Sequence, residues 1–411
     1  MTDSIVIAGA GHAAGQAAVS LRQGGFTGRI VMIGEEPYLP YQRPPLSKKF
    51  LSGELELDRM YVRHQKFYDE HNIDVRLSTR VETINRDDQT VTLSDGSTES
   101  YNRLIIATGS EVRRLNIPGH DLAGVNYLRS VADVEAIQEN FKPGANLVII
   151  GAGYIGMEVA AIGISMGLDV TVVESAPRIM ARALAPEVSV FFDQVHREAG
   201  VKILCDRDPN SELLGKDGKV YALKAADGME IPADLVIVGI GILPTATLAE
   251  AAGLECDNGI VVDEYCHTSD PHIFAIGDCT NHPNSLLGKR LRLESVHNAQ
   301  EQAKTAAAAL CGELKPYNQI PWFWSDQYDL KLQIVGLSGD HDQVVIRGSF
   351  EDRSFAAFYM KGDLLIAVDA VNSAREFMLS KKLIAQGARI DPEILADTSI
   401  EFKALATAAL N

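Results

Sequence analysis

Short apolar runs that end in glycine recur along the chain, and stretches with helical spacing separate them. The first run, SIVIA at Ser4–Ala8, stops at Gly9, and a helix-compatible stretch, QAAVSLRQGG, leads to a second apolar run, RIVMIGEE. This order predicts strand, turn, helix and strand, the unit that joins two parallel strands of one sheet. Strands that are apolar throughout indicate a sheet covered on both faces.

The turn after the first strand carries small residues at fixed spacing, Gly9-Ala-Gly11-His-Ala-Ala14. Gly9 permits a tight turn, Gly11 lets the backbone approach a pyrophosphate, and Ala14 allows close packing of the helix on the strand. The N-terminus of the helix presents free N–H groups and a partial positive charge to phosphates. Glu35 ends the second strand, where an acid receives ribose hydroxyls. These features predict a dinucleotide site.

The same pattern recurs later in the chain. In NLVIIGAGYIGMEVAAIGISMGLDVTVVES the small residues are Gly151, Gly153 and Gly156, and Glu174 ends the second strand. A single motif of this kind arises by chance at glycine turns, whereas two of them, each in strand–turn–helix–strand context and each ending in an acid, are far more specific. Two dinucleotide folds predict two bound dinucleotides.

Three further glycine-ended apolar runs extend this plan. They end at or pass Thr108-Gly109 in RLIIATGS, Gly239 and Gly241 in DLVIVGIGILP, and Gly277-Asp278 in HIFAIGDC. Ligands in parallel sheets bind at the carboxyl ends of the strands, so these positions are predicted to line the cofactors. HIFAIGDC follows the second nucleotide fold, yet it supplies a strand that the first fold needs. The second fold is therefore predicted to be inserted into the first.

The last part of the chain has a different pattern. Apolar residues alternate with polar ones at Tyr328, Leu330, Leu332 and Ile334, which predicts a half-buried strand. A hairpin signal, Lys361-Gly362-Asp363, lies between SFAAFYM and LLIAVDAV, and the helical stretch SAREFMLSKKLIAQ follows. This pattern predicts an antiparallel sheet with helices on one face.

The predicted fold class is α/β, with two Rossmann-like dinucleotide-binding domains and a C-terminal α+β domain. The first domain is expected at 1–114 and 243–320, the inserted second domain at 115–242, and the C-terminal domain at 321–411.

Composition limits the partners and the compartment. The net charge of −17 argues against nucleic acid as the main partner, because neutralising phosphates needs a basic surface. No apolar run approaches the roughly 20 residues of a membrane helix, and MTDSIVIAGAG has no basic segment before its apolar run. The five cysteines show no paired spacing, so neither a metal site nor a disulfide framework is expected. A cytoplasmic location is predicted.

Taken together, the motifs resemble the two-dinucleotide-binding flavoproteins of the glutathione-reductase superfamily. Within that superfamily they are most similar to the NADH-dependent ferredoxin reductases of bacterial cytochrome P450 and ring-hydroxylating dioxygenase systems. The likeness covers essentially the whole chain and rests on GAGHAAGQAA, PYQRPPLSK, LIIATGS, GAGYIGMEVAA, GIGILP, AIGDC, LESVHNAQEQA and PWFWSDQY. It implies that the first fold binds FAD without a covalent bond and the second binds NADH. Electrons would then pass singly to a [2Fe-2S] ferredoxin that supplies an oxygenase.

The segment YQRPPLSKKF bears on the route of the electrons. Its two prolines are predicted to open a short helix. In disulfide-reducing relatives the corresponding helix carries the reactive cysteine pair, but this segment contains no sulfur. The resemblance implies that Lys48 lies beside the isoalloxazine and that Glu158 is its partner, in an ion pair that keeps a buried ammonium charged. These two residues are the predicted catalytic pair.

The resemblance assigns further contacts. Asp278 is expected to accept the ribityl hydroxyls, and a helix beginning at Ser295 or Val296 is expected to point its positive end at the flavin's pyrimidine edge. Other implied contacts with FAD come from Ala13, Val81, Arg129 and Val296.

Two aromatic segments are also implied in the site. Tyr154, in Gly153-Tyr154-Ile155-Gly156, is expected to lie over the flavin and to move aside for nicotinamide. Trp324 is expected to line the flavin edge that faces the partner, whereas Trp322 and Phe323 are expected in the core.

Specificity and docking rest on charge. Glu174 favours NADH over NADPH because a carboxylate repels a 2′-phosphate, although Arg178 and Arg182 lie close enough in sequence to soften that repulsion. Ferredoxins of the matching type are acidic, so an acidic reductase needs a local basic patch. The candidates are Lys289, Arg290, Arg292, Lys304 and Lys331.

Three alternatives remain open at this stage. In the first, the acceptor is a rubredoxin or a small radical quinoid instead of a ferredoxin. In the second, the protein is an NADH oxidase that makes peroxide. In a different class, an apoptosis-inducing-factor-like protein uses NADH binding to control association. That relative acts through a basic surface, whereas this chain is acidic.

Overall fold

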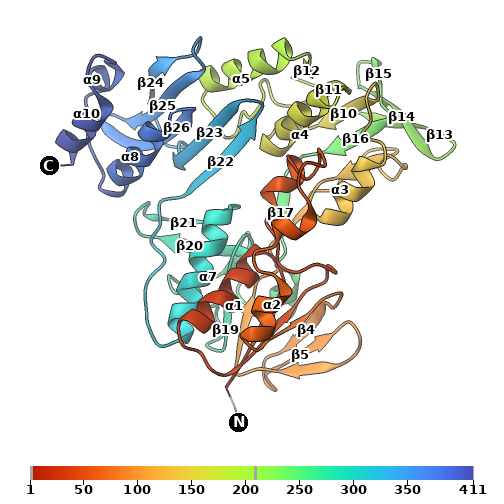
Figure 1. Ribbon diagram of the computed structural model, residues 1–411, viewed down its shortest axis with the longest axis vertical. Helices are drawn as coiled ribbons and strands as arrows, with labels where there is room; N and C mark the ends of the chain where they lie inside the picture. The colour runs from red at the N-terminus through yellow and green to blue at the C-terminus, as the bar shows by residue number, and fades with distance from the viewer. Residues whose placement is uncertain (1–2, 208–210, 411) are drawn as a thin grey trace. The chain divides into compact units, whose positions relative to one another are not determined.

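The computed structural model describes residues 3–207 and 211–410, and its chain divides into two compact units (Figure 1). Unit 1 consists of Met1–Arg43, Glu56–Glu111 and Ile242–Pro321, and unit 2 of Pro44–Leu55, Val112–Gly241 and Trp322–Asn411. Most of both chain segments expected for the first nucleotide fold lies in unit 1, but Pro44–Leu55 and residues 112–114 of the first segment lie in unit 2. The second fold, the C-terminal part and the segment with Lys48 lie in unit 2. The predicted domain boundaries themselves remain a proposal.

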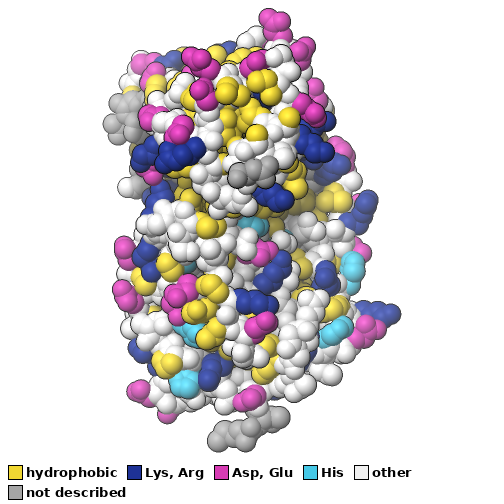
Figure 2. Space-filling view, turned by 90° about the vertical axis from the view of Figure 1, so that its left-hand side faces the viewer, with side chains coloured by type: hydrophobic (Ala, Val, Ile, Leu, Met, Phe, Trp, Pro, Cys, Tyr) yellow, Lys and Arg dark blue, Asp and Glu magenta, His cyan; other side chains and the backbone are white. Residues whose placement is uncertain are grey.

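Charges of both signs are spread over the surface. On the face shown in Figure 2, Asp and Glu side chains lie among Lys and Arg side chains, with apolar side chains between them. On this face, then, the negative net charge does not form one continuous acidic field. No helix in the described part of the chain is long and apolar enough to cross a bilayer.

The core of unit 1 is a parallel sheet in the order β19–β7–β1–β2–β3. Its strands are β1 (Ser4–Ala8), β2 (Arg29–Ile33), β3 (Ile73–Arg76), β7 (Arg103–Ile106) and β19 (Ile273–Ala275). After β3 the chain returns to the other side of β1, so the strand order reverses there, and ligands bind at such points. Residue Ile273 of β19 pairs in parallel with Leu104 of β7, which confirms that the first fold is completed after the inserted one.

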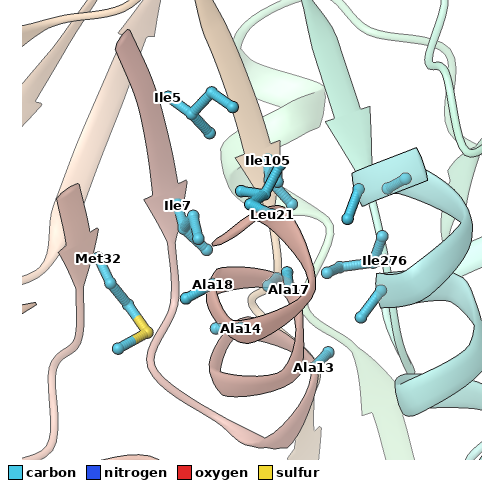
Figure 3. Close-up of a cluster of buried hydrophobic side chains, with 14 of the residues drawn as sticks. Ile5, Ile7, Ala13, Ala14, Ala17, Ala18, Leu21, Met32, Ile105 and Ile276 are labelled. Carbon is cyan, nitrogen blue, oxygen red and sulfur yellow. The ribbon is translucent and has the colours of Figure 1, made fainter. Parts of the chain in front are cut away.

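Each face of this sheet is covered, as the apolar strands predicted. Successive residues of β1 point to opposite faces. Ile5 and Ile7 lie in one cluster with alanines of helices α1 (His12–Gln23) and α7 (Val296–Leu310) (Figure 3). Val6 and Ala8 lie in a second cluster with the antiparallel meander β4 (Val81–Asn85), β5 (Thr90–Leu93) and β6 (Thr98–Ser100).

The remaining elements of unit 1 are short. They are η2 (Leu57–Met60), α2 (Gln65–Glu70), α6 (Thr247–Ala251), β18 (Ile260–Val261), β20 (Thr280–Asn284) and β21 (Lys289–Leu291). Two further short strands, β8 (Ser110–Val112) and β17 (Ile242–Pro244), pair with each other.

Unit 2 contains a second parallel sheet with the same plan, in the order β12–β11–β10–β16–β9. Its strands are β9 (Val125–Tyr127), β10 (Asn146–Ile150), β11 (Asp169–Val173), β12 (Lys202–Leu204) and β16 (Leu235–Val238). Strand β10 has the central place that β1 has in unit 1, so both predicted nucleotide folds are confirmed. The two sheets differ in the origin of one edge strand: β9 comes before the central strand β10 in the sequence, whereas β19 comes after the central strand β1.

Helices and a meander accompany this sheet. They are η1 (Pro44–Ser47), α3 (Val131–Gln138), α4 (Tyr154–Ser165) and α5 (Pro186–Glu198), with β13 (Glu212–Lys216), β14 (Lys219–Lys224) and β15 (Glu230–Pro232). The two prolines of η1 open a single 3-10 turn, as predicted from their fixed φ and missing N–H.

The C-terminal part is an antiparallel sheet in the order β22–β23–β26–β25–β24, also as predicted. Its elements are β22 (Trp322–Gln327), β23 (Leu330–Gly336), β24 (Gln343–Ser349), β25 (Ser354–Lys361), β26 (Leu364–Val371), α8 (Ala374–Ala385), α9 (Pro392–Ala396) and α10 (Phe402–Ala409). The predicted hairpin is present, with Lys361 paired to Leu364. One detail of the prediction was wrong: Tyr328 lies between β22 and β23 with φ +55, because the turn needs a left-handed residue.

Candidate functional site

The first glycine of each nucleotide turn is required by the backbone. Gly9 has φ +126 and Gly151 has φ +102, a region that side chains rarely enter. A Cβ at Gly9 would lie 2.3 Å from the carbonyl oxygen of Ala107, and one at Gly151 would lie 2.5 Å from that of Gly239. Each turn therefore passes directly over the neighbouring strand's end, as predicted for a tight turn between sheet and helix.

The second glycine of each turn has a different explanation. Gly11 and Gly153 have ordinary negative φ, and a Cβ at either position would meet no described atom within 4 Å. They precede α1 and α4, whose N-termini have no side-chain cap and no acid in the first turn. Neither backbone conformation nor packing within the described residues requires glycine there. The predicted close approach of a pyrophosphate to the uncapped N–H groups would require it.

A buried polar atom at the first turn supports this interpretation. The Nδ1 atom of His12, the first residue of α1, is buried without a hydrogen-bond partner among the described residues, while its Nε2 lies 3.0 Å from Gln300. Buried polar groups are nearly always hydrogen-bonded, so a ligand at this helix terminus would remove the anomaly. Both folds thus fit a dinucleotide.

The two predicted ribose acids are held differently. Oxygens of Glu174 accept hydrogen bonds from the backbone N–H groups of Ala152 at 2.7 Å and Ala176 at 2.8 Å, which fixes the carboxylate against the second glycine turn. Glu35 is exposed and lies 3.5 Å from Arg80. Arg178 donates to the carbonyl oxygens of Leu184 and Ala181, so two of its donors are committed to the backbone.

The structure joins the two predicted catalytic residues. The Nζ atom of Lys48 lies 2.6 Å from Oε2 of Glu158, and the side chains are 16% and 5% exposed. Lys48 follows η1 directly, and Nζ also lies 3.3 Å from the carbonyl oxygen of Pro44. Ser47 donates to the same oxygen of Glu158 at 2.5 Å. The Pro-Pro turn therefore places two donors on one buried carboxylate.

Helix α4 brings the carboxylate to strand β22. Tyr154 and Glu158 are one turn apart on the helix, about 6 Å along its axis, and residues two apart on a strand are separated by about 6.6 Å. The ring of Tyr154 packs edge-on against Phe323 at 4.7 Å, and Glu158 accepts a hydrogen bond from Ser325 at 2.7 Å. The matching spacing puts one face of β22 in register with the helix.

The aromatic residues of this region depart partly from expectation. The hydroxyl of Tyr154 is buried and has no partner within the described residues, and burial raises its pKa well above the usual value. Trp324 lies 5.7 Å from Trp322. Trp322 and Phe323 are only half-buried, so the prediction that they lie in the core was wrong. Both residues belong to β22, which is the edge strand of its sheet. The role of Tyr154 at the flavin stays a prediction.

Within unit 1, Asp278 follows β19 and accepts a hydrogen bond from Ser110 at 3.0 Å. Arg43 was not singled out from the sequence. It binds Glu36 at 2.7 Å, and although burial alone would lower the pKa of Arg43, the charges of Tyr41, Glu36 and Asp278 raise it. Its position next to the Pro-Pro turn was the only available signal.

The other predicted contacts take ordinary places. Ala13 and Val81 are buried in the two clusters of unit 1, and Ser295 caps α7 by accepting from Asn298, which confirms the helix start at Val296. Thr108 donates a hydrogen bond to the carbonyl of Thr245, and Gly109 and Gly241 have φ +67 and +105. Gly239 follows β16, Gly156 packs on Gly151, and Ala14 is fully buried. Arg129 precedes the capped helix α3, and Ile155 is 43% exposed. Their cofactor roles stay predictions.

The predicted basic patch is partly neutralised. Arg290 donates to Asn281 and to the carbonyl of Val262, and Arg292 pairs with Glu294. Lys304 is half exposed and pairs with Glu301 at 2.6 Å. Lys289 and Lys331 are exposed.

All five cysteines are free, and burial raises the pKa of Cys279 to about 11, which makes its thiol a poor nucleophile. No group of His, Cys, Asp and Glu in the described ranges is arranged to hold a metal ion.

Comparisons with known proteins agree with this geometry. Residues 3–303 match the family model described as pyridine nucleotide-disulphide oxidoreductase, and residues 322–406 match the reductase C-terminal model. The chain is 42% identical to putidaredoxin reductase of Pseudomonas putida, over 99% of this chain and 97% of the relative.

Two solved structures are also similar. The ferredoxin reductase for the CYP199A2 system from Rhodopseudomonas palustris has a TM-score of 0.95 and 43% identity, covering 99% of this chain and 100% of the other. The covalent putidaredoxin reductase–putidaredoxin complex contains a chain with a TM-score of 0.94 and 42% identity, with 99% of each chain covered. The chain therefore belongs to the pyridine nucleotide-disulphide oxidoreductase family and, within it, to the putidaredoxin reductase-like ferredoxin reductases.

Proposed function

We propose that this protein carries electrons from NADH through FAD to a [2Fe-2S] ferredoxin that supplies an oxygenase such as a cytochrome P450. The observation that carries the proposal is the buried Lys48–Glu158 pair, because it is formed by a sulfur-free turn. Disulfide-reducing members of the superfamily have their reactive cysteines at that place. Here the electrons leave from the flavin to an outside acceptor.

Each nucleotide fold has its own cofactor. Residues that would hold FAD in unit 1 are Gly9, Gly11, Ala14, Glu35 and Asp278, and those that would hold NADH in unit 2 are Gly151, Gly153, Gly156 and Glu174. FAD, when bound, accepts a hydride and returns its electrons singly, which is the chemistry that a one-electron protein acceptor needs. The protein supplies N–H donors for the phosphates, and it supplies the Lys48 ammonium, which the ion pair with Glu158 holds in place.

The acceptor is the finer part of the proposal. The similarity to a chain crystallised in complex with putidaredoxin supports a ferredoxin. A rubredoxin or oxygen would use the same flavin, and acceptor assays separate them. An apoptosis-inducing-factor-like role with nucleic acid is disfavoured by the net charge of −17. The five free thiols support a cytoplasmic location.

The purified protein is expected to be yellow, with one FAD per chain released by denaturation. Addition of NADH without oxygen should bleach the flavin absorbance near its visible maximum. The measurement is the ratio of released FAD to protein, followed by anaerobic titration with NADH. A stable, colourless protein that does not take up added FAD would refute the proposal.

NADH is expected to exceed NADPH in kcat/KM by at least about tenfold, equivalent to about 1.4 kcal/mol. Two backbone N–H groups hold the Glu174 carboxylate against the second glycine turn, where we expect it to repel a 2′-phosphate, and two donors of Arg178 are bound to carbonyl oxygens. Glu174→Ala should lower the ratio of kcat/KM for NADH to kcat/KM for NADPH. Equal efficiencies in the unaltered protein would show that this carboxylate does not meet the ribose.

Lys304→Glu is expected to raise the KM for ferredoxin about threefold to tenfold, because a rim charge acts mainly on association with a charged partner. It would place a second carboxylate beside Glu301 on an exposed face of α7. Turnover with ferricyanide should not change, since small acceptors need no docking patch. Lys315→Glu is the matched control, because Lys315 is also exposed and paired with a glutamate, Glu313. Equal effects of the two variants on the KM for ferredoxin would contradict a local docking role.

A further inference from the structure

The Lys48–Glu158 pair is the inner end of a continuous chain of hydrogen bonds. Ser325 lies 2.7 Å from Oε1 of Glu158, and the amide nitrogen of Gln327 lies 3.1 Å from the hydroxyl of Ser325. The amide oxygen of Gln327 lies 2.8 Å from Nε2 of His196, whose Nδ1 lies 3.0 Å from the hydroxyl of Tyr328. All of these residues belong to unit 2.

Every donor in this chain points toward the carboxylate. The amide oxygen of Gln327 can only accept, so Nε2 of His196 carries the proton. Burial lowers the pKa of His196 to about 4, so the ring is neutral and its Nδ1 accepts from Tyr328. Gln327 then donates to Ser325, and Ser325 donates to Glu158. Hydrogen bonds aligned in one direction polarise one another, which strengthens the bond from Ser325 to Glu158.

The chain of hydrogen bonds from Glu158 to Tyr328 is buried except at its outer end. Ser325 and His196 are 0% exposed and Gln327 is 1% exposed, whereas Tyr328 is 36% exposed. Ser325 and Gln327 occupy the inward positions of β22, and His196 comes from the last turn of α5. Packing alone would favour apolar residues at such positions, since a buried polar side chain is tolerated only when it is fully hydrogen-bonded.

We propose that Ser325, Gln327, His196 and Tyr328 are positioning residues that orient the Glu158 carboxylate, and through it hold the Lys48 ammonium in place. This inference rests on the proposed function, in which Lys48 serves the flavin. The chain is not a proton wire, because transfer through the amide of Gln327 would require its imidic acid form. Its role is to set the orientation of one carboxylate.

Two variants test the chain at its two ends. Ser325→Ala removes the donor that contacts Glu158, and Tyr328→Phe removes only the outer hydroxyl from a partly exposed ring. Ser189→Ala is the matched control. Ser189 lies on the same helix as His196 but outside the hydrogen-bond chain, and its fully buried hydroxyl donates to the carbonyl oxygen of Ile179 at 2.6 Å. The measurements are the limiting rate of flavin reduction by NADH without oxygen, the Kd for NADH, and the Tm.

Ser325→Ala is expected to slow flavin reduction about tenfold, equivalent to about 1.4 kcal/mol, and Tyr328→Phe about twofold to threefold, with the Kd for NADH unchanged in both. Ser189→Ala should lower the Tm but leave the rate unaltered. In a Glu158→Gln background, Ser325→Ala should slow the rate by less than about twofold, because the effect passes through the carboxylate.

Two results would overturn the inference. If Glu158→Gln slows flavin reduction but Ser325→Ala and Tyr328→Phe behave like Ser189→Ala, the chain has no positioning role and the proposed function stands. If Glu158→Gln itself leaves the rate unchanged, the role of the ion pair is refuted together with that of the chain. The surface variant Tyr328→Phe decides the question if Ser325→Ala does not fold.

Discussion

Replacing Gly153 with valine is expected to raise the Kd for NADH by at least about a hundredfold while the protein stays yellow. A Cβ at Gly153 would have no described atom within 4 Å apart from its chain neighbours, so the fold should tolerate valine, but the side chain would fill the space over the N-terminus of α4. Loss of two hydrogen bonds to charged phosphate, each worth about 1.5 kcal/mol or more, corresponds to roughly that factor. Anaerobic titration of the FAD-loaded protein with NADH measures it.

The same substitution in the first fold should abolish binding of FAD instead of NADH. Gly11→Val is expected to yield folded but colourless protein, because the same open space lies over α1. Gly339→Val is the matched control, since a Cβ at Gly339 also meets no described atom and its φ is not positive. If Gly153→Val lost FAD and Gly11→Val lost NADH, the two folds would have been assigned to the wrong cofactors.

Replacing Glu158 with glutamine is expected to slow flavin reduction by NADH about thirtyfold, equivalent to about 2 kcal/mol. The change leaves the Lys48 ammonium, whose side chain is 16% exposed, without its counter-charge. A buried ammonium without its partner is unfavourable and is expected to turn toward water, which moves the positive charge away from its predicted place at the flavin. Rapid mixing of the oxidised protein with NADH under anaerobic conditions measures the rate.

A second buried carboxylate provides the control for this variant. Glu99 pairs with Arg29 and with Arg76 in unit 1, and its side chain is 10% exposed. Glu99→Gln should lower the Tm without changing the rate of flavin reduction. Similar rates in the two variants would mean that Glu158 acts only as a structural ion pair. Lys48→Met should reproduce the slow phenotype of Glu158→Gln, because the two residues act as one unit.

The sequence predicted the sheets well because their strands are buried on both faces. Continuous apolar runs such as Ser4–Ala8 leave few alternatives, and the glycine turns mark where each strand stops. The pairing of Lys48 with Glu158 came from resemblance, since the two residues are far apart in the chain and no local pattern joins them. The structure adds their distance and the donors Ser47 and Ser325.

Other features depend on tertiary contacts that a linear pattern does not contain. The chain from Tyr328 to Glu158 joins residues of α4, α5 and β22 across long sequence separations. Its only local signal was the pair of polar residues, Ser325 and Gln327, at alternate positions among aromatic neighbours. Charge density likewise could not show that Arg290 is bound to Asn281 and to the carbonyl of Val262.

Tyr328 illustrates a limit of periodicity. Its apolar character continued the alternation of the following strand, although it lies in the turn with φ +55. An aromatic residue in a left-handed turn is unusual, so the pattern favoured the wrong interpretation. Its exposed ring and its hydrogen bond to His196 became visible only in the structure.

The two electrons of the hydride from NADH are proposed to leave this protein one at a time, each on a ferredoxin. The most direct test mixes the FAD-loaded protein, NADH and excess oxidised [2Fe-2S] ferredoxin without oxygen, and follows NADH and the cluster absorbance together. Two reduced ferredoxins are expected for each NADH consumed, because a hydride carries two electrons and the cluster takes one. Flavin that NADH reduces fully while every ferredoxin tested stays oxidised would contradict it.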